Sequence, residues 1–374
     1  MSSIGEQFEL YSGNTPSRMN KNQFDGSINW ITSGELKEHY ISDTKEKISE
    51  EAAKNNSLKL LPVGTFVIAI YGLEANGVRG TCSITTREST ISQACMAFTS
   101  KMDIQNEFLY SWYKKHGNII GIKYAQGTKQ QNLSYDIIER FNISYPCMEE
   151  QKKLIRFISL IDQRIATQNK IIEDLKKLKS AIIEIEYSPK DSYHSHIGGA
   201  IVQISKRNKD NDLCNVLSVS NRQGFIKQSE QFEDRNVASD DTSNYKIVEK
   251  NDFAYNPARI NVGSIARLTK FETGIVSPMY ICFRTKDCLL PEYLELFFES
   301  RNFFYHIQKR LEGSVRLCLS YEELCNIPIV IPSIEKQKQV DLHLSKLAQK
   351  IDLEMKILQF VQQQKTYLLH QMFI

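Results

Sequence analysis

Apolar residues recur every three or four positions along two long stretches of the chain, and this spacing predicts two amphipathic helices. The steps alternate between three and four, as they do in helices that pair along one seam. A proline, Pro146 or Pro332, stands just before each stretch, and acidic residues follow it, as is typical of a helix N-terminus. We predict that the seam consists of Ile158, Ile161, Ile165, Ile172, Leu175 and Ile182 in the first helix and of Leu344, Leu347, Ile351, Leu358, Val361 and Leu368 in the second.

The two stretches are copies of one internal repeat. Residues 133–187 align without a gap with residues 319–373, at an offset of 186. Polar residues interrupt both seams at equivalent positions, as expected where two partner helices have a fixed register. The alternative is that two unrelated amphipathic helices pack separately on their own domains. In register are Pro146 with Pro332, Gln151 with Gln337, Ile165 with Ile351, and Lys179 with Lys365.

The repeat divides the chain into a globular part, a helix, a second globular part and a second helix, with expected bounds of 1–148, 149–188, 189–334 and 335–374. Because the ends of a domain often lie close together, the end of the first helix should lie beside the start of the second. We therefore expect an antiparallel coiled coil with roughly 30 to 35 residues per helix. One domain would lie at each end, in a circular arrangement with an approximate twofold axis.

Both globular parts mix short β segments with helices. Residues 60–72 and 246–260 each predict a turn followed by a strand. Segments near 105–116 and 291–312 predict helices. The predicted fold class is therefore α+β, with two tandem α/β domains separated by two long helices.

Composition says little about a partner, because the net charge is only +3. Residues 1–148 contain 15 Lys and Arg against 15 Asp and Glu, and residues 190–334 contain 18 against 18. Each globular part is formally neutral. Any contact with nucleic acid must therefore come from local clusters of side chains.

The eight cysteines include no C-x-x-C pair, so the chain offers no zinc-ribbon spacing, and we expect reduced, mostly buried thiols. His194 and His196 flank a serine, but two histidines without a third ligand are weak evidence for a metal, and we expect none. The first residues lack a basic segment followed by an apolar run, and no window approaches eighteen uninterrupted apolar residues. We therefore expect a cytoplasmic protein with no membrane contact.

Several segments resemble the specificity subunits of type I restriction-modification systems. The strongest local matches are SGNTPSR (12–18), INWITSGEL (28–36) and the segments 146–165 and 332–351. The tandem plan of globular domain and helix, repeated once, is more specific than any of these. The resemblance covers essentially the whole chain.

The resemblance implies that 1–148 and 189–334 are target-recognition domains that each read one half of a bipartite site in double-stranded DNA. It implies that the helices are spacers that set the gap and dock two modification (methyltransferase) subunits, which restriction (motor-nuclease) subunits join. The chain itself would be non-catalytic and bind no cofactor. S-adenosylmethionine, ATP and Mg²⁺ would bind to the other subunits.

Unpartnered apolar residues on the outer faces of the helices would make the isolated chain poorly soluble. Candidates for these faces are Ile155, Leu160 and Leu342.

Residues that read DNA should carry guanidinium, amide or hydroxyl groups on loops, because Arg pairs with guanine and Asn or Gln with adenine. The second domain has Leu217 where the first has Trp30, which we expect to be a core residue. The candidate DNA-binding residues are Arg18, Lys21, Asn22, Gln23, Thr32, Ser33, Lys129, Gln130 and Gln131 in the first domain and Asn221, Arg222, Gln223, Asn256, Arg259 and Arg316 in the second.

Two other classes of function remain as alternatives. A self-sufficient amino-methyltransferase needs an Asp/Asn-Pro-Pro-Tyr/Phe motif to hold a flipped base, and the nearest string, at Asn256-Pro257, fails at its third and fourth positions. A phosphate-binding loop of the type G-x-x-x-x-G-K-[ST] does not occur in the sequence. A coiled-coil scaffold that binds only proteins is the second alternative.

Overall fold

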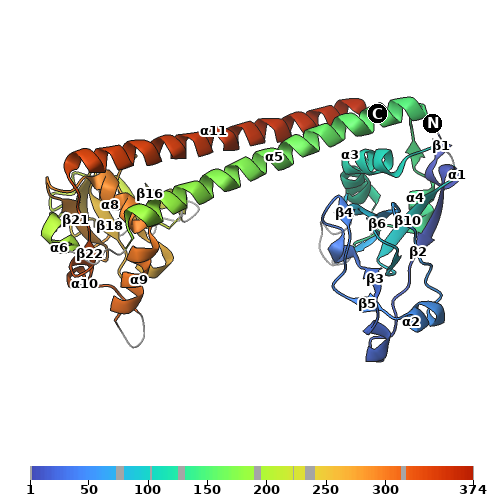
Figure 1. The fold of residues 1–374 in the computed structure, drawn as a ribbon, viewed down its shortest axis with the longest axis horizontal. Helices are drawn as coiled ribbons and strands as arrows, with labels where there is room; N and C mark the ends of the chain where they lie inside the picture. Colours follow the sequence, from blue (N-terminus) through green and yellow to red (C-terminus); the bar gives the residue numbers. More distant parts are fainter. Residues whose placement is uncertain are drawn as a thin grey trace. The chain divides into compact units, whose positions relative to one another are not determined.

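The chain folds into two compact units (Figure 1). The computed structural model describes residues 2–72, 80–101, 103–124, 131–188, 195–221, 223–231, 241–312 and 317–373. Unit 1 comprises residues 1–168 and 357–374, and unit 2 comprises residues 169–356. Two helices of 39 residues, α5 (Met148–Glu186) and α11 (Ile334–Met372), contribute to both units. They are longer than predicted.

The centre of unit 1 is a five-stranded sheet in the order β2-β10-β6-β8-β4. Its middle strands, β6 and β10, carry apolar residues at nearly every buried position, as strands covered on both faces do. The strands of this sheet are β2 (Phe8–Ser12), β10 (Cys95–Ser100), β6 (Phe66–Ala69), β8 (Cys82–Thr85) and β4 (Tyr40–Ile41). Smaller sheets contain β5 (Lys47–Ile48), β3 (Ile28–Ile31) and β9 (Ser89–Ile91), β1 (Ser2–Ser3) with β12 (Asn142–Ile143), and β7 (Tyr71–Gly72) with β11 (Gln131–Asn132).

The helix α3 (Asn106–Tyr124) packs against β6 and β8 of this sheet and extends beyond the predicted segment 105–116. The apolar core between them also receives Ile158 of α5 and Phe373 after α11. Both long helices are thereby anchored on unit 1. The shorter helices are α1 (Ile4–Gln7), α2 (Glu50–Asn55), α4 (Tyr135–Glu139) and the 3₁₀ helices η1 (Lys21–Phe24) and η2 (Ser33–Glu35).

Unit 2 contains two four-stranded sheets, in the orders β14-β21-β18-β19 and β16-β15-β20-β17. The strands of the first are β14 (Ile201–Ile204), β21 (Ile281–Thr285), β18 (Phe253–Tyr255) and β19 (Ile265–Arg267). Those of the second are β16 (Gly224–Lys227), β15 (Val216–Ser220), β20 (Thr273–Val276) and β17 (Lys246–Glu249). A small sheet pairs β13 (Ser195–His196) with β22 (Pro328–Ile329).

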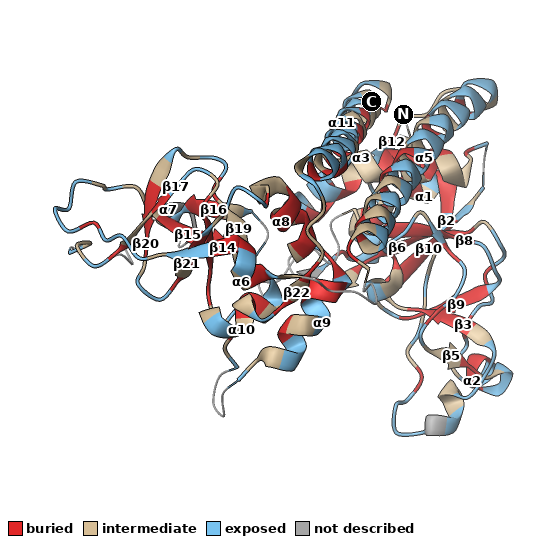
Figure 2. Ribbon diagram, turned by 60° about the vertical axis from the view of Figure 1, so that its left-hand side comes forward, coloured by how far each residue is buried: buried red, intermediate tan, exposed pale blue. Residues whose placement is uncertain are grey.

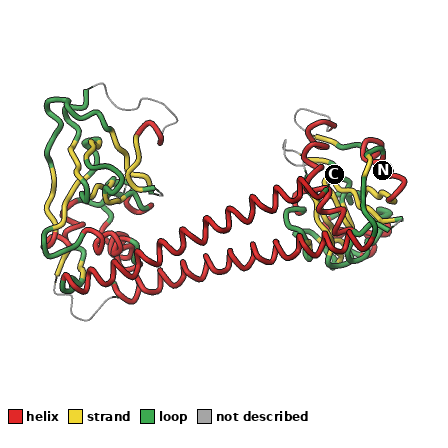
Figure 3. The backbone as a smooth tube through the Cα atoms, turned by 90° about the horizontal axis from the view of Figure 1, so that it is seen from above, coloured by secondary structure: helices red, strands yellow, loops and turns green. Residues whose placement is uncertain are grey.

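The helix predicted over 291–312 is two helices, α8 (Pro291–Phe298) and α9 (Arg301–Arg310). Ser300 separates them, because its hydroxyl accepts a hydrogen bond from the main-chain NH of Phe303 (3.1 Å) and caps the second helix. The other helices are α6 (Ile197–Ala200), α7 (Gln228–Gln231), α10 (Tyr321–Cys325) and the 3₁₀ helix η3 (Ile260–Val262). Figure 3 shows strands and short helices mixed in both units, which agrees with the predicted α+β class.

Within each unit α5 and α11 run in opposite directions. In unit 2, Glu186 near the end of α5 lies 3.6 Å from Lys336 near the start of α11, measured from Oε2 to Nζ. In unit 1, Asp162 of α5 forms an ion pair with Lys365 near the end of α11. All twelve residues of the predicted seam are buried or half-buried, whereas most of the remaining surface of both helices is exposed (Figure 2).

The expected outer-face residues differ in their surroundings. Leu160 and Leu342 are exposed, as the sequence predicts. Ile155 is not, because it packs against the core of unit 1. Amphipathic spacing alone does not separate a face that meets the domain from one that meets solvent.

Candidate nucleic-acid interface

A cavity of about 550 Å³ in unit 2 brings together three of the residues predicted to bind DNA. Asn221 directly follows β15, and Asn256 directly follows β18. Arg259 lies in the loop between Asn256 and β19. The ends of two strands from different sheets and one connecting loop therefore build this site.

The loop from Asn256 to Ser264 is held in one conformation by its own hydrogen bonds. The main-chain NH of Asn256 donates to the carbonyl of Ser264 (3.0 Å), and the NH of Ser264 donates back to the carbonyl of Arg259 (3.1 Å). Gly263 adopts a left-handed conformation with φ of 89°, which permits the reversal at the end of η3. The Ser264 hydroxyl donates to the carbonyl of Val219 (3.1 Å) and ties the loop to β15.

Two side chains of this loop are available to a ligand. Asn256 is 7% exposed, and its Oδ1 accepts a hydrogen bond from the main-chain NH of Ala258 (3.1 Å). Within the described ranges, neither the Nδ2 of Asn256 nor the guanidinium of Arg259 has a hydrogen-bond or ion-pair partner. An amide donor and a guanidinium are groups that contact base edges and phosphates.

Other features of this cavity differ from the prediction. Val262 and Met279 line it although neither is among the predicted residues. Their signal in the sequence is a large apolar residue in a turn, outside the alternation of any strand. Gln223 is exposed, and its main-chain carbonyl accepts from the Nζ of Lys270 (3.2 Å). Two predicted residues of the second domain, Arg222 and Arg316, lie outside the described residues.

In unit 1, the predicted DNA contact Arg18 is engaged by a carboxylate. Its two terminal nitrogens lie 2.8 and 2.9 Å from the two carboxylate oxygens of Glu46. Its guanidinium also lies over the rings of Phe24 (5.4 Å) and Trp30 (5.9 Å). The hydrogen bond to Glu46, and then its charge, raise the pKa of Arg18, and the hydrogen bond from Arg18 lowers the pKa of Glu46. Arg18 can reach DNA only by leaving or sharing this partner.

Thr32 has a structural role at the start of η2. Its hydroxyl and its main-chain NH both donate to Oε2 of Glu35, at 2.9 and 2.8 Å, which closes a capping box. Ser33 follows it and is half-buried. The Thr32 hydroxyl therefore belongs to a helix cap, a role that residue type alone did not distinguish from DNA contact.

The remaining predicted residues of unit 1 lie in separate segments. Gln23 in η1 accepts at its Oε1 from the Nδ2 of Asn56 (3.3 Å), and Asn22 beside it is exposed. Lys21 lies in η1 and Gln131 in β11, and their side chains are not among those described. Lys129 and Gln130 lie outside the described residues.

Trp30 is a core residue, as predicted. It is 1% exposed, and its indole NH donates to the carbonyl of Asn14 (3.2 Å). All eight cysteines are free thiols. The prediction that most of them are buried is wrong, because only Cys82, Cys95 and Cys282 are. Burial raises the pKa of each of these three thiols to about 12 and makes them unreactive.

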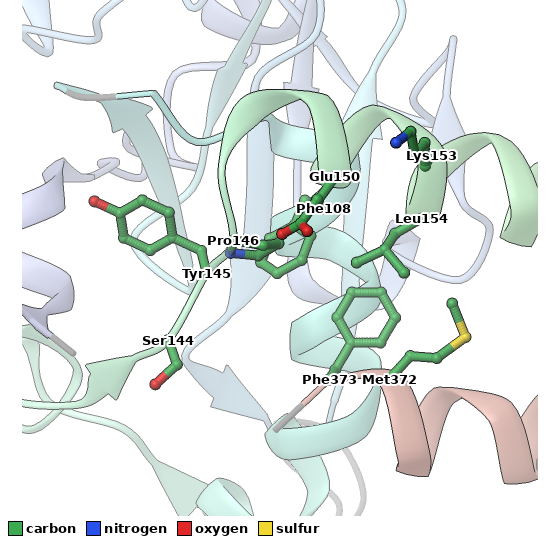
Figure 4. A pocket seen from close by; sticks show the side chains of 9 residues that line it. All are labelled: Phe108, Ser144, Tyr145, Pro146, Glu150, Lys153, Leu154, Met372 and Phe373. Atoms are coloured by element: carbon green, nitrogen blue, oxygen red, sulfur yellow. The ribbon is translucent and has the colours of Figure 1, made fainter.

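A second cavity, of about 480 Å³, lies in unit 1 where α5 begins and α11 ends (Figure 4). The rings of Phe108 and Phe373 pack beside it, with centroids 5.1 Å apart. Leu154 and Met372 add apolar surface, and Lys153 is the basic residue of its lining. This cavity belongs to the junction of the helices with the domain and contains none of the predicted DNA contacts.

The described ranges contain neither a metal-ligand cluster nor a membrane-spanning helix. No group of three or more His, Cys, Asp or Glu side chains there is placed to hold a metal ion. His196 is exposed in β13, and His194 lies outside the described part of the chain. No helix among the described residues combines the length and the apolar character needed to cross a membrane.

Comparison with known proteins finds relatives of the N-terminal part of the chain. Residues 1–177 match the family model of the type I restriction modification DNA specificity domain. The MjaIX specificity subunit of Methanocaldococcus jannaschii is 28% identical over 188 residues, which are 48% of this chain and 42% of that protein. The EcoR124I/EcoR124II specificity subunit of Escherichia coli is 26% identical over 178 residues, 46% of this chain and 43% of that protein. Each match thus spans less than half of the relative.

Solved structures share the fold of the whole chain. The S subunit of a type I system from M. genitalium has a TM-score of 0.54 at 14% identity and covers 100% of this chain and 95% of its own. A second structure, whose description concerns complex assembly and conformational transition of the type I R-M system, has a TM-score of 0.62 at 13% identity. The match covers 99% of this chain and 96% of that one. Residues 1–177 therefore resemble the type I restriction modification DNA specificity domain, and the chain as a whole has the fold of type I specificity subunits.

Proposed function

We propose that this chain is the DNA sequence-recognition subunit of a type I restriction-modification enzyme. Unit 1 would read one half of a bipartite target and unit 2 the other. The observation that carries this proposal for unit 2 is the cavity where the available amide of Asn256 and the available guanidinium of Arg259 meet Asn221. For unit 1, the support is the family match of residues 1–177.

The long helices would set the gap between the half-sites and dock the other subunits. Large apolar side chains are exposed along them, including Leu160 (54%), Leu342 (50%) and Phe360 (67%). Such surfaces are typical of faces that another protein covers. We infer that two modification subunits dock there and that restriction subunits join them.

Catalysis would belong to those partners. S-adenosylmethionine, ATP and Mg²⁺ would bind to the modification and restriction subunits, and this chain would position the DNA for them. The interaction with DNA must be local, since both globular parts are formally neutral. We therefore expect high affinity only in the assembled complex.

The test is reconstitution of the chain with its modification subunit, followed by mapping of the methylated adenines and DNA binding at several salt concentrations. We expect methylation at one bipartite sequence and an affinity that falls steeply with salt, because phosphate contacts release counterions. Assembly without sequence preference would favour the scaffold alternative. Methyl transfer by the chain alone would favour a self-sufficient enzyme.

A further inference from the structure

The cavity beside Asn256 combines the available amide donor of Asn256 with two exposed apolar side chains. Val262 is 51% exposed and Met279 is 57% exposed, although burial of such side chains stabilises a fold. Both line the same cavity as Asn256. Val262 ends η3, and Met279 lies between β20 and β21. Two exposed apolar side chains in turns that line one cavity with Asn256 indicate a ligand with an apolar group.

The donor limits what the ligand can be. Oδ1 of Asn256 accepts from the main-chain NH of Ala258, whereas Nδ2 has no partner among the described residues and is the donor that Asn256 offers a ligand. In the major groove of DNA, a single donor fits O4 of thymine, N7 of adenine, or O6 and N7 of guanine. Cytosine presents an amino group there and is rejected. The donor by itself therefore leaves three bases.

The apolar side chains distinguish among thymine, adenine and guanine. Thymine alone has an apolar group on its major-groove edge, the C5 methyl, and this group is adjacent to O4. We propose that the cavity receives the edge of one thymine of the target, with Asn256 donating to O4 and with Val262 and Met279 contacting the methyl group. This inference rests on the proposed function, and it names the base that unit 2 reads at this position.

Hydrogen bonds hold the walls of the cavity in place. The loop carrying Asn256 and Val262 is closed by the hydrogen bonds described above. Tyr280 also lines the cavity. Its hydroxyl accepts from the main-chain NH of Val219 (3.4 Å), and its main-chain carbonyl accepts from the Nζ of Lys246 (2.6 Å). Because a preorganised site cannot close around a smaller ligand, a base without the methyl group leaves part of the cavity unfilled and binds more weakly.

The first experiment uses the reconstituted complex and duplexes in which each thymine of the target is replaced singly by uracil, which lacks only the methyl group. We expect one position, in the half-site read by unit 2, to bind about fourfold more weakly, as the loss of one buried methyl predicts. Met279→Ala should bring this thymine-to-uracil ratio close to one, and Val262→Ala should lower it. The matched control is Val202→Ala, since Val202 is 50% exposed on β14 and does not line the cavity.

The second experiment reverses the hydrogen bond. Asn256→Asp keeps an oxygen for the main-chain NH of Ala258 and replaces the available donor by an acceptor. The variant should prefer 5-methylcytosine to thymine at that position, because 5-methylcytosine keeps the methyl group and offers an amino donor. The added negative charge weakens binding to all DNA, so the ratio of the two affinities is the readout.

Each outcome decides the inference. Selective binding that is insensitive to uracil at every thymine of the second half-site, or a half-site without thymine, overturns the thymine assignment and leaves the recognition function standing. Loss of a guanine preference in Arg259→Ala, with no effect of uracil, assigns the cavity to guanine instead. Absence of any sequence-selective binding by the complex overturns the proposed function and the inference with it.

Discussion

Gln151 and Gln337, separated by 186 residues in the sequence, make the same three hydrogen bonds in their respective units. Each is 0% exposed. Each side-chain amide donates to two main-chain carbonyls, and each side-chain oxygen accepts from a main-chain NH. For Gln151, the partners are the carbonyls of Asp103 (2.8 Å) and Pro146 (3.0 Å) and the NH of Gln105 (3.0 Å). For Gln337, they are the carbonyls of Cys288 (3.0 Å) and Pro332 (2.8 Å) and the NH of Leu290 (2.8 Å). The repeat thus preserves a joint between the start of each long helix and the loop before α3 or α8.

Replacing either glutamine by leucine should destabilise its unit by about 2–4 kcal/mol, because three buried polar groups lose their partner. The two tryptophans of the chain, Trp30 and Trp112, are both buried in unit 1. Gln151→Leu should therefore shift the urea transition followed by tryptophan fluorescence. Gln337→Leu should shift the transition followed by circular dichroism and leave the fluorescence transition in place.

The control for this pair is Gln163→Leu, on the exposed side of α5. Its side chain makes one long contact, 3.5 Å to the hydroxyl of Ser159. Its effect should stay within about 0.5 kcal/mol. Equal effects of all three substitutions would show that the buried hydrogen bonds are not what holds the joint.

The ion pair of Arg18 and Glu46 predicts a specific pH dependence. Arg18 lowers the pKa of Glu46, so folding favours the charged carboxylate. The pair therefore contributes stability above the ordinary pKa of glutamate and loses it as the pH falls through the lowered pKa of the folded state. The difference in stability between the protein and Glu46→Gln should be constant from about pH 6 to about pH 8 and should shrink below about pH 4. A difference that changes near neutrality would contradict this.

The same pair tests whether Arg18 contacts DNA. Glu46→Gln releases the guanidinium and removes a negative charge, so the complex should bind its target more tightly. Arg18→Ala should weaken binding and reduce the slope of log affinity against log salt by about one, if the guanidinium meets a phosphate. The variant that combines Glu46→Gln with Arg18→Ala shows whether the gain in affinity caused by Glu46→Gln depends on Arg18. An unchanged gain in the double variant would remove Arg18 from the interface.

The second globular part should be exchangeable as a module. Replacement of residues 190–318 by the same region of a relative should change one half-site and leave the other intact, because the repeat boundaries lie outside the segments that line the cavity of unit 2. Methylation mapping gives both half-sites in one experiment. A change in both half-sites, or in the other one alone, would disprove the assignment of units to half-sites.

The length of the helices should set the gap between the half-sites. Asp162 pairs with Lys365, which places Ile165 opposite the region of Val361 in unit 1. Four residues inserted after Ile165 and four after Phe360 lengthen both helices by one turn, about 6 Å. The half-sites should then move apart by one or two base pairs with their bases unchanged. Insertion in one helix alone serves as a control and should reduce stability. An active complex with an unchanged gap would contradict the idea.

The exposed faces of the helices should govern the behaviour of the isolated chain. Leu160→Gln and Leu342→Gln should make it more monodisperse in sedimentation without lowering its melting temperature, since both side chains are about half exposed. The same substitutions should weaken association with the modification subunit. Ile155→Gln is the contrasting variant, because Ile155 packs on the core of unit 1 and its loss should lower the melting temperature. A lone chain that is already monodisperse would contradict this prediction.

The sequence by itself determined the features that repeat with a short period or recur along the chain. The heptad spacing of residues such as Ile165 and Ile351 predicted both long helices, and the offset of 186 predicted two units of one plan. These features are readable because the burial of one helix face imposes a local spacing of three and four residues. The α+β class followed in the same way from short strands and helices within each repeat.

Only the tertiary structure decided which polar residues are available to a ligand. Arg18 forms an ion pair with Glu46, 28 positions away, and the hydroxyl of Thr32 donates to Glu35 within a helix cap. The cavity of unit 2 joins segments near Asn221, Asn256 and Met279. Such sites depend on contacts between segments far apart in the chain, and these contacts leave no periodic signal. Residue type therefore predicted which residues could bind DNA, and the packing of distant segments determined which of their side chains remain available to a ligand.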